Sequence, residues 1–597
     1  MESRHLKTGL IISLFAISVA VIFAYRSPAL GYELSIYEST PVTFWVSVVL
    51  ALSLSTFILF KSDNSISYLA GGVILLGSLT IIALPIIRGY YWIGIADPST
   101  HYGWVKDLMT GKLSFGGFLY PLLHTLSILL VESTGQSLRW IMMFVVIVFA
   151  LLFIIFVPLA TRRISVYELD WKIALIAGAA FLPVNHIGTY HMFHPTSQSV
   201  MSYPLFLFAL ALYLTTEGTP RVLIFYLVNI FFVFLHPQHA INIIIICFSV
   251  GVLQIYHKKE EINKISVTSI SIPSLATALV LYLSISMNKR FNQSLGLLVV
   301  ELLNFNPSSS AVAQQGTSLA AVGGSLSDIF IKIFLISSVF AAAAVVVVLL
   351  HLHLFLQDRE HHNPIIVYVG LSMVPLGIMT IILTIVKSNT VPLRYAGVMM
   401  SIATVIGAIG LGHVARWVDK RHLSTKHVQT LTAVVVLVML LSSVPVMQSS
   451  PTIYKGSLAV SESTKSGFET SLDHRGEGMI FLNNRLETFR MSQMYYGVAK
   501  SNSLDITLDS TSIIRTSQYP DHFANQSLPS VIPEDRYVVV TLLDRKRDVQ
   551  LYNEFRFSRD DFAYLQRDPN INNIVSTGEF DLHYVEKETN QTPSEID

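Results

Sequence analysis

The chain has 597 residues, of which 52% are hydrophobic and only 13% charged, and its mean hydropathy is +0.55. Average soluble chains carry about 25% charged residues, so this composition excludes an ordinary soluble protein. The net charge of +1 is divided unequally, because residues 451–597 carry −7 and residues 1–450 carry +8. The single cysteine, Cys247, excludes an intrachain disulfide, and we expect no nucleic-acid partner.

Apolar segments recur along the first three quarters of the chain. Many are close to the roughly 20 residues that a helix needs to cross a bilayer. Membrane-spanning β-strands would be about 10 residues long with strict alternation, which these continuous runs lack. We therefore predict a polytopic α-helical membrane domain over residues 1–447. The thirteen predicted spans are Thr8–Ala24, Val42–Phe60, Ile66–Ile87, Leu138–Leu159, Trp171–Pro183, Val200–Tyr213, Val222–Leu235, Ile241–Ile255, Ile265–Met287, Ile329–Leu354, Ile365–Ile385, Tyr395–Ala415 and His427–Val446.

A further apolar piece, Leu119–Val131, is short and contains a proline and His124. We predict that it is a re-entrant or interfacial segment. With thirteen spans and the N-terminus inside, the basic loops 161–172, 257–264 and 416–426 all lie inside, as the positive-inside rule requires. The sequence thus predicts a plasma-membrane protein with a cytoplasmic N-terminus and an extracytoplasmic C-terminal segment.

Residues 448–597 differ in character from the membrane domain. Their β-rich runs are Gly478–Leu482, Asp535–Leu543 and Gly578–Val585, separated by helix-compatible pieces such as Asp548–Phe555. This pattern predicts a small mixed α/β soluble domain that is large enough for one core.

Two of the predicted outer loops are long. The loop 88–137 begins with a polar stretch that includes Asp97 and His101, four residues apart. The loop 288–328 is rich in Ser, Ala, Gly and Gln in its later part, and we predict that it is mobile, as a lid or an acceptor-admitting loop would be. Ionisable groups near membrane depth are costly and cluster where function or internal pairing compensates. We therefore expect the loop 88–137 to form one side of a site.

Other polar side chains gather in the same predicted outer loops. They are His124, His186, His191, His194, His236, His239, Asp107, Tyr120 and Arg394. A guanidinium matches a phosphate bidentately, although Arg394 could instead extend to the interface for solvation. Asp97 before Pro98 is also a good helix start, with Asp as the N-cap and Pro as the first helical residue. His191 and His194 have metal-compatible spacing, but without an evident third ligand we assign no metal site.

The loop reads Ala96-Asp97-Pro-Ser-Thr-His101-Tyr-Gly-Trp-Val-Lys-Asp107, followed by Tyr120-Pro-Leu-Leu-His124 and a short apolar helix. Arg394 stands at the outer end of a late span, and a soluble segment ends the chain. This order resembles the membrane-embedded glycosyltransferases of the C-type (GT-C) fold, in a prokaryotic, archaeal-like form. The chain departs from the family pattern in having three spans before the acidic loop and no Asp-x-Asp element.

The resemblance implies transfer of a sugar from a polyprenyl-phosphate donor to a lipid-linked glycan or protein acceptor at the outer membrane face. Asp97 would be the general base, and His101 would orient Asp97 or bind the acceptor. Arg394, with His236 or His239, would stabilise the departing phosphate. The remaining substrate-binding candidates are His191, His194, Asp107, Tyr120 and His124.

No cofactor is assigned, and a divalent metal ion stays open. Two other functions also stay open at this point. One is an outer-face polysaccharide polymerase or ligase, and the other is a multi-span transporter. Transporters place charges at the bilayer midplane, whereas the titratable residues of this chain collect at one end of the predicted spans.

Overall fold

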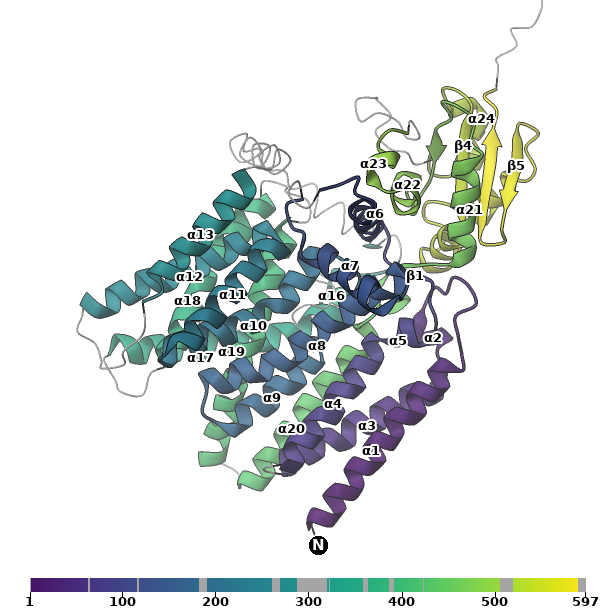
Figure 1. Ribbon diagram of the computed structural model, residues 1–597. Coiled ribbons are helices and arrows are strands. Elements are labelled where there is room, and N and C mark those ends of the chain that lie inside the picture. The colour runs from purple at the N-terminus through teal and green to yellow at the C-terminus, as the bar shows by residue number, and fades with distance from the viewer. Residues whose placement is uncertain are drawn as a thin grey trace, which may run out of the picture.

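The computed structural model describes residues 2–62, 65–114, 118–181, 191–259, 269–286, 319–320, 323–357, 363–385, 391–421, 424–504 and 519–588. It shows a bundle of long helices with a small mixed domain at one end (Figure 1). Of the predicted mobile loop 288–328, most lies outside the described residues.

Each predicted span is occupied by a helix in the described part of the chain. These helices are α1 (Glu2–Tyr25), α3 (Val42–Lys61), α4 (Ser65–Ile82), α8 (Leu138–Ile164), α9 (Glu168–Ala179), α10 (Pro195–Thr215), α11 (Thr219–Leu235), α12 (Pro237–Lys259), α13 (Ser271–Ser286), α17 (Leu335–Leu356), α18 (Pro364–Ile385), α19 (Val391–Arg421) and α20 (Thr425–Ser443). The short helix α16 (Leu326–Ile329) and a π-helical turn lead directly into α17.

Ten of the described helices are long and apolar enough to cross a membrane, which confirms a polytopic helical protein. The helices α11 and α13 have 17 and 16 residues, and α9 has only 12. All residues of α9 from Asp170 to Ala179 are buried, as expected for a helix enclosed by its neighbours. The number of crossings, thirteen, therefore stays a prediction.

Close helix contacts hold the bundle together. The helix α19 packs against α17, α18 and α9, and α8 packs against α10 and α9. A Cβ atom on Gly407 or Gly410 of α19 would lie 2.2 Å or 2.3 Å from a backbone oxygen of α17. Only glycine permits this approach, which is the usual role of small residues between membrane helices.

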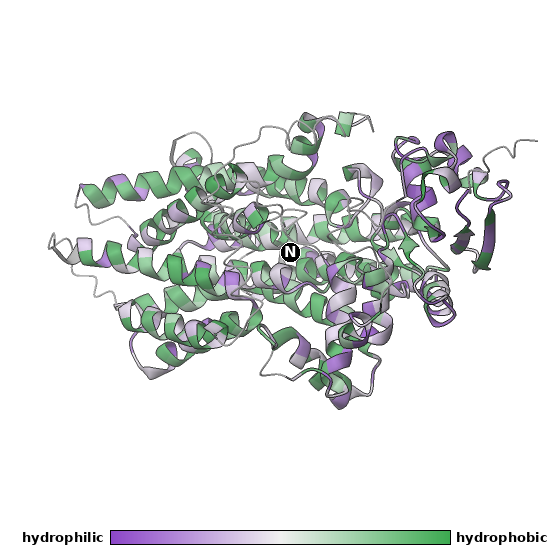
Figure 2. Cartoon of the chain, turned by 90° about the horizontal axis from the view of Figure 1, so that it is seen from above, coloured by the Kyte–Doolittle hydropathy of each residue, from purple (hydrophilic) through white to green (hydrophobic). Residues whose placement is uncertain are grey.

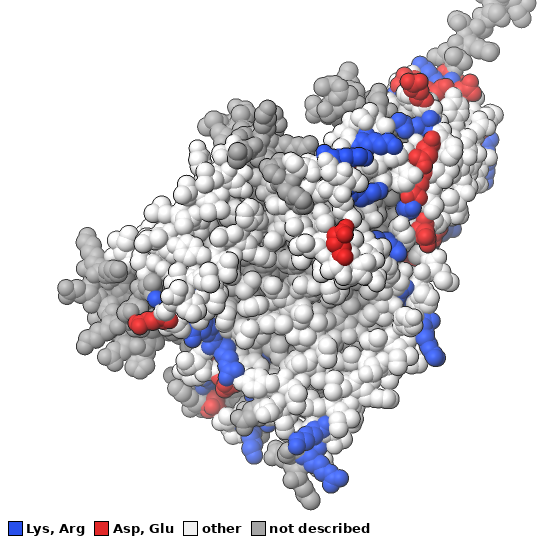
Figure 3. Space-filling view, in the orientation of Figure 1, with Lys and Arg blue, Asp and Glu red and all other residues white. Residues whose placement is uncertain are grey.

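Polar and apolar surfaces are separated along the molecule. The bundle is mostly hydrophobic and the C-terminal domain mostly hydrophilic (Figure 2). On the face shown in Figure 3, charged side chains gather on the C-terminal domain and toward the opposite end of the bundle, and few lie on the flank between. This belt fits a membrane-embedded flank, while the assignment of the two sides to cytoplasm and exterior stays a prediction.

The C-terminal domain is built on a four-stranded sheet of order β3-β4-β6-β5. Its strands are β3 (Phe481–Leu482), β4 (Arg536–Thr541), β5 (Ile571–Ser576) and β6 (Phe580–Val585). Only β3 and β4 run parallel. The helices α21 (Glu462–Asp473) and α22 (Thr488–Tyr496) belong to the same domain.

Three of these strands confirm the predicted β-rich runs. The edge strand β5 was not predicted, because it is largely exposed and contains two asparagines, which are depleted in strands. The helix-compatible piece Asp548–Phe555 is helical only in its first half, because the π-helical turn Lys546–Leu551 is followed by irregular turns.

The loop 88–137 and the C-terminal domain meet at one end of the bundle. The loop contains β1 (Trp92–Ile93), α6 (Asp97–Met109) and α7 (Leu122–Thr134), after the short helix α5 (Leu84–Ile87). Strand β1 pairs antiparallel with β2 (Ala459–Val460), and α6 packs against α22. The predicted segment Leu119–Val131 corresponds to α7, which lies beside α6 (Figure 1).

A buried ion pair fixes the entry to this loop. The Arg88 guanidinium is 2% exposed and makes two 2.7 Å hydrogen bonds to the Glu33 carboxylate, in bidentate fashion. Such pairs add geometric specificity. The pair ties the segment around Glu33, including the neighbouring Tyr32, to the start of the loop 88–137.

Candidate functional site

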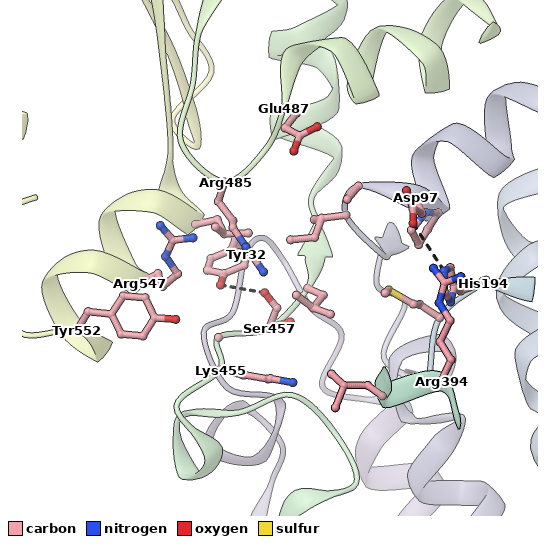
Figure 4. Close-up of a pocket in the computed structure, with 18 residues that line it drawn as sticks. Tyr32, Asp97, His194, Arg394, Lys455, Ser457, Arg485, Glu487, Arg547 and Tyr552 are labelled. Atoms are coloured by element: carbon pink, nitrogen blue, oxygen red, sulfur yellow. Dashed lines mark hydrogen bonds and ion pairs between the residues drawn. The ribbon is translucent and has the colours of Figure 1, made fainter. Parts of the chain in front are cut away.

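A cavity of about 300 Å³ lies where the loop 88–137 meets α19 and the C-terminal domain. Figure 4 shows its lining, with Asp97, His194 and Arg394 on one side and Arg485, Arg547 and Tyr552 on the other. We call the first three the membrane wall. The C-terminal wall consists of Lys455, Arg485, Arg547 and Tyr552. Tyr32 and Glu487 also line the cavity.

Asp97 is the first residue of α6 and not its N-cap. The N-cap is Ala96, whose φ of +63° and ψ of −117° are uncommon for a residue with a side chain, and no side chain caps the helix. Such a conformation costs about 1–3 kcal/mol and persists only where the surroundings fix it. The expectation that Asp97 caps the helix is therefore wrong, and its carboxylate is available to other partners.

Two basic side chains contact the Asp97 carboxylate. His194 Nε2 lies 3.6 Å from Asp97 Oδ2, and Arg490 Nη2 lies 3.3 Å from Asp97 Oδ1. The nearby His194 imidazole, and then the charges of Arg490 and Arg394, lower the pKa of Asp97 and outweigh the opposing effect of burial. The side chain is 52% exposed, so an ionised carboxylate faces the cavity.

Arg490 holds this arrangement from the C-terminal domain. It lies on α22 and donates a 2.6 Å hydrogen bond to Thr100 Oγ1, one turn along α6 from Asp97. Its Nε is also 3.5 Å from the Glu487 carboxylate. The carboxylate proposed as a base is therefore positioned jointly by the membrane domain and the C-terminal domain.

His101 lies apart from Asp97. Its ring is buried, and its Nδ1 is 3.0 Å from Nε2 of His124 on α7. The Trp104 and Phe193 rings lie 5.0 Å and 6.0 Å away. Burial lowers the pKa of both imidazoles, to about 3 for His124, so both are neutral at pH 7.

We predicted that His101 orients Asp97, but in the structure His101 pairs with His124 instead. His101 lies on the face of α6 that packs against α7, where neighbouring rings shield it from solvent. His194 takes the expected place beside the carboxylate.

Arg394 shares the cavity with Asp97, as the sequence predicts. It is the fourth residue of α19, and its Nη1 donates a 3.2 Å hydrogen bond to Gln238 Oε1 at the start of α12. In Figure 4 its side chain extends toward His194 and Asp97. A carboxylate and a guanidinium almost 300 residues apart in sequence thus line one cavity.

His236, His239 and Tyr120 lie next to this wall without lining the cavity. The Tyr120 and His236 rings are 5.4 Å apart, and the His236 and His239 rings 5.3 Å apart. Thr196 Oγ1 is 3.3 Å from His236 Nε2. Gln238, between His236 and His239 in the sequence, accepts a hydrogen bond from Arg394, and the contact of these three residues with substrate stays a prediction.

Asp107 and His191 lie elsewhere. The Asp107 carboxylate accepts a 2.8 Å hydrogen bond from the backbone N–H of Ala499, so it attaches α6 to the C-terminal domain. The His191 ring packs 5.4 Å from that of Phe181 and lines a separate small recess. Neither Asp107 nor His191 lines the cavity, in contrast to the substrate contacts predicted for them. His186 lies outside the described residues.

Sequence reasoning did not identify the C-terminal wall. The net charge of −7 over residues 451–597 concealed a local cluster of basic side chains. Burial, and then the charge of Arg485, lower the pKa of Lys455 to about 8. The one signal in the sequence for Lys455 was its position shortly after the last predicted span.

Among the described residues, no group of three or more His, Cys, Asp or Glu side chains is arranged to hold a metal ion. Asp97 and His194 could supply two donors. The question of a divalent ion thus stays open.

Comparisons with known proteins gave structural matches alone. No family model and no curated protein matches the chain. The structure is similar to ArnT from Cupriavidus metallidurans in the apo state, with a TM-score of 0.40 and 11% identity over 91% of this chain and 98% of that one. It is also similar to the Archaeoglobus fulgidus oligosaccharyltransferase, in the form tethered to an acceptor peptide and in the apo form. These two matches have TM-scores of 0.44 and 0.45 and 12% identity, over 87% and 88% of this chain and 74% and 76% of those chains.

Proposed function

We propose that this protein is a membrane glycosyltransferase that moves a sugar from a polyprenyl-phosphate donor to a lipid-linked glycan or protein acceptor at the outer membrane face. The observation that carries the proposal is that the Asp97 carboxylate and the Arg394 guanidinium lie on the same wall of one cavity. It lies at the end of a membrane helix bundle, where a lipid-bound phosphate can reach it.

The two groups suit the two halves of a glycosyl transfer. The acceptor hydroxyl oxygen forms a bond to the anomeric carbon, and the bond from that carbon to the phosphate oxygen breaks. The hydroxyl proton passes to Asp97, and the electron pair of the broken bond leaves with the phosphate. A positioned base contributes about 10²–10⁴-fold, and a fixed cation stabilises the charge that develops on the leaving group.

The surroundings of Asp97 support its role as a base. His194 and Arg490 keep the carboxylate ionised at neutral pH by lowering its pKa. A lower pKa also makes the carboxylate a weaker base, so its contribution comes from its position beside the acceptor hydroxyl. Their contacts from two directions also fix its orientation. His194 is thus a positioning residue, in the role that we predicted for His101.

The alternatives predict different products. A polymerase or ligase would share this chemistry but extend or join glycan chains. A transporter would move its substrate unchanged and needs a site near the bilayer midplane. The position of the cavity against the soluble domain favours chemistry on the membrane surface over transport.

The test is a transfer assay with the purified full chain. Wild type and Asp97→Asn are incubated with a panel of polyprenyl-phosphate sugars and with membrane-extracted acceptors, and covalent transfer is followed by mass spectrometry. We expect transfer by wild type and a loss of about 10²–10⁴-fold in Asp97→Asn.

Asp521→Asn is the matched control, because Asp521 is 51% exposed and also pairs with an arginine, Arg556. It should keep the wild-type rate. Equal rates for Asp97→Asn and wild type would remove Asp97 as the base. Transfer from no donor by wild type would overturn the proposed function.

A further inference from the structure

The C-terminal wall presents three cationic side chains to the cavity. The carboxylates that line the cavity belong to Asp97 and Glu487, and both contact Arg490, which is not a lining residue. Arg485 and Arg547 line the opposite side, and Lys455 lines the cavity lower in the view of Figure 4, between them and Arg394. Ion pairs among the described residues join Arg547 to Asp548, and none reaches Arg485.

Arg547 is held in place before any ligand binds. Its side chain is 10% exposed, and its Nη2 lies 2.8 Å from an oxygen of the fully buried Asp548 carboxylate. Asn484 Nδ2 donates a 3.0 Å hydrogen bond to that same carboxylate oxygen. A guanidinium fixed in this way loses little side-chain entropy when it binds an anion.

The positive charges of Arg485 and Lys455 repel each other. The backbone N–H of Arg485 donates a 3.1 Å hydrogen bond to Asp544 Oδ1, which fixes the segment that presents its exposed side chain. The charge of Arg485 and burial both lower the pKa of Lys455. An anion bound between the two cations would relieve this repulsion.

The C-terminal wall is separate from the place expected for the donor phosphate. Arg394 stands in the first turn of the long helix α19, where we expect the donor phosphate. The C-terminal wall belongs to the soluble domain and lies across the cavity from it (Figure 4). A group bound there comes from a second substrate that approaches from the aqueous side.

We propose that the C-terminal wall binds an anionic group of the acceptor, so that the preferred acceptor is an acidic glycan bearing a carboxylate or a phosphate. Carboxylates and phosphates both match an arginine fork. The volume of about 300 Å³ is at the lower end of the ~300–1,000 Å³ of small-molecule sites, so it holds a small part of such a glycan. This inference rests on the proposed function.

Direct binding to the full chain in detergent is the first arm of the test. The probes are a uronic-acid oligosaccharide, a phosphorylated oligosaccharide and a neutral oligosaccharide of equal length, measured by isothermal titration calorimetry. We expect one of the acidic probes to bind at least about 10-fold more tightly than the neutral one, as a charged hydrogen bond provides. The better of the two acidic probes identifies the anionic group.

Variants localise the binding. Arg485→Gln should lower the affinity for the acidic probe by about 10-fold and leave the affinity for the neutral probe unchanged. Lys455→Arg should still bind the acidic probe more tightly than the neutral one. Arg567→Gln, at an exposed arginine outside the cavity, is the matched control and should bind as wild type does. Thermal unfolding confirms that each variant is folded.

Equal affinity for all three probes, or an unchanged affinity in Arg485→Gln, would overturn the inference. The second arm separates it from the proposed function. Transfer by wild type to acidic and neutral acceptors with equal KM would overturn the inference and leave the function standing. Acid-selective binding with no transfer from any donor would overturn the function and leave an anion site.

Discussion

The two walls of the cavity differ in origin and in expected task. The membrane wall comes from the starts of α6, α10 and α19, and it holds an ionised carboxylate and a guanidinium on one side of the cavity. The C-terminal wall comes from the soluble domain and carries mainly positive charge. The difference suggests a division of labour, in which the membrane wall performs the bond exchange and the C-terminal wall selects the acceptor.

The largest effect is expected on the membrane wall, at Arg394. Its replacement by Gln removes the cation that stabilises the departing phosphate. We expect kcat to fall by about 10²–10³-fold, as for other fixed donors to a developing negative charge. Arg394→Lys should recover part of the rate, because a lysine supplies the charge without the planar fork. The measurement is steady-state transfer, and an unchanged kcat in Arg394→Gln would remove this residue from the chemistry.

The pH dependence of transfer tests the surroundings of Asp97. The base acts when ionised, and His194 and Arg490 lower its pKa. Removing a partner raises that pKa, so the rate should begin to fall at a higher pH than in wild type when the medium is acidified. We expect a larger shift in His194→Ala than in Arg490→Gln, because the interaction with His194 has the largest effect on the pKa of Asp97.

The control for Arg490→Gln is Arg556→Gln, which removes a guanidinium from the exposed Asp521. Its pH profile should match that of wild type. An acid limb that stays in place in both His194→Ala and Arg490→Gln would contradict the account of Asp97.

On the C-terminal wall, Lys455 should make acceptor binding depend on pH on the alkaline side. Its pKa of about 8 means that it is charged below pH 8 and loses its charge above it. Burial raises the pKa of the Tyr32 hydroxyl, so Lys455 is the group of this wall that we expect to titrate near pH 8. The KM for an acidic acceptor should rise several-fold above about pH 8 in wild type and remain level in Lys455→Arg. A KM that rises equally in both proteins would exclude Lys455 as the cause.

The smallest effect on turnover is expected at Asp107, where the two domains meet. Asp107→Ala removes the acceptor of the Ala499 N–H, a charged hydrogen bond of about 1.5–3 kcal/mol. We expect a melting temperature lowered by a few degrees, measured by scanning fluorimetry, with KM values close to those of wild type. A raised KM with an unchanged melting temperature would instead support substrate binding by Asp107.

The sequence predicted the helical elements well because a bilayer imposes long apolar runs. It also predicted Asp97 and Arg394 in one site, because charged residues at the ends of such runs are rare. It could not separate Asp97 from Asp107, ten residues apart on α6. One faces the cavity and the other accepts a backbone N–H from the C-terminal domain, and only tertiary packing decides between them.

The C-terminal wall could not be predicted from sequence patterns for a related reason. Lys455, Arg485 and Arg547 are spread over more than 90 residues of a domain with a net negative charge. No local spacing connects them. The sheet and the pairing of β1 with β2 bring them to one cavity, and those are long-range contacts without a short motif.

The division of labour between the walls is tested most directly by measuring kcat and the acceptor KM for Arg394→Gln and Arg485→Gln with one acidic acceptor. We predict that Arg394→Gln lowers kcat with little change in KM, because its contact strengthens only in the transition state. Arg485→Gln should raise KM with little change in kcat, because it affects binding alone. If both variants change the same constant in the same way, the two walls do not have separate tasks.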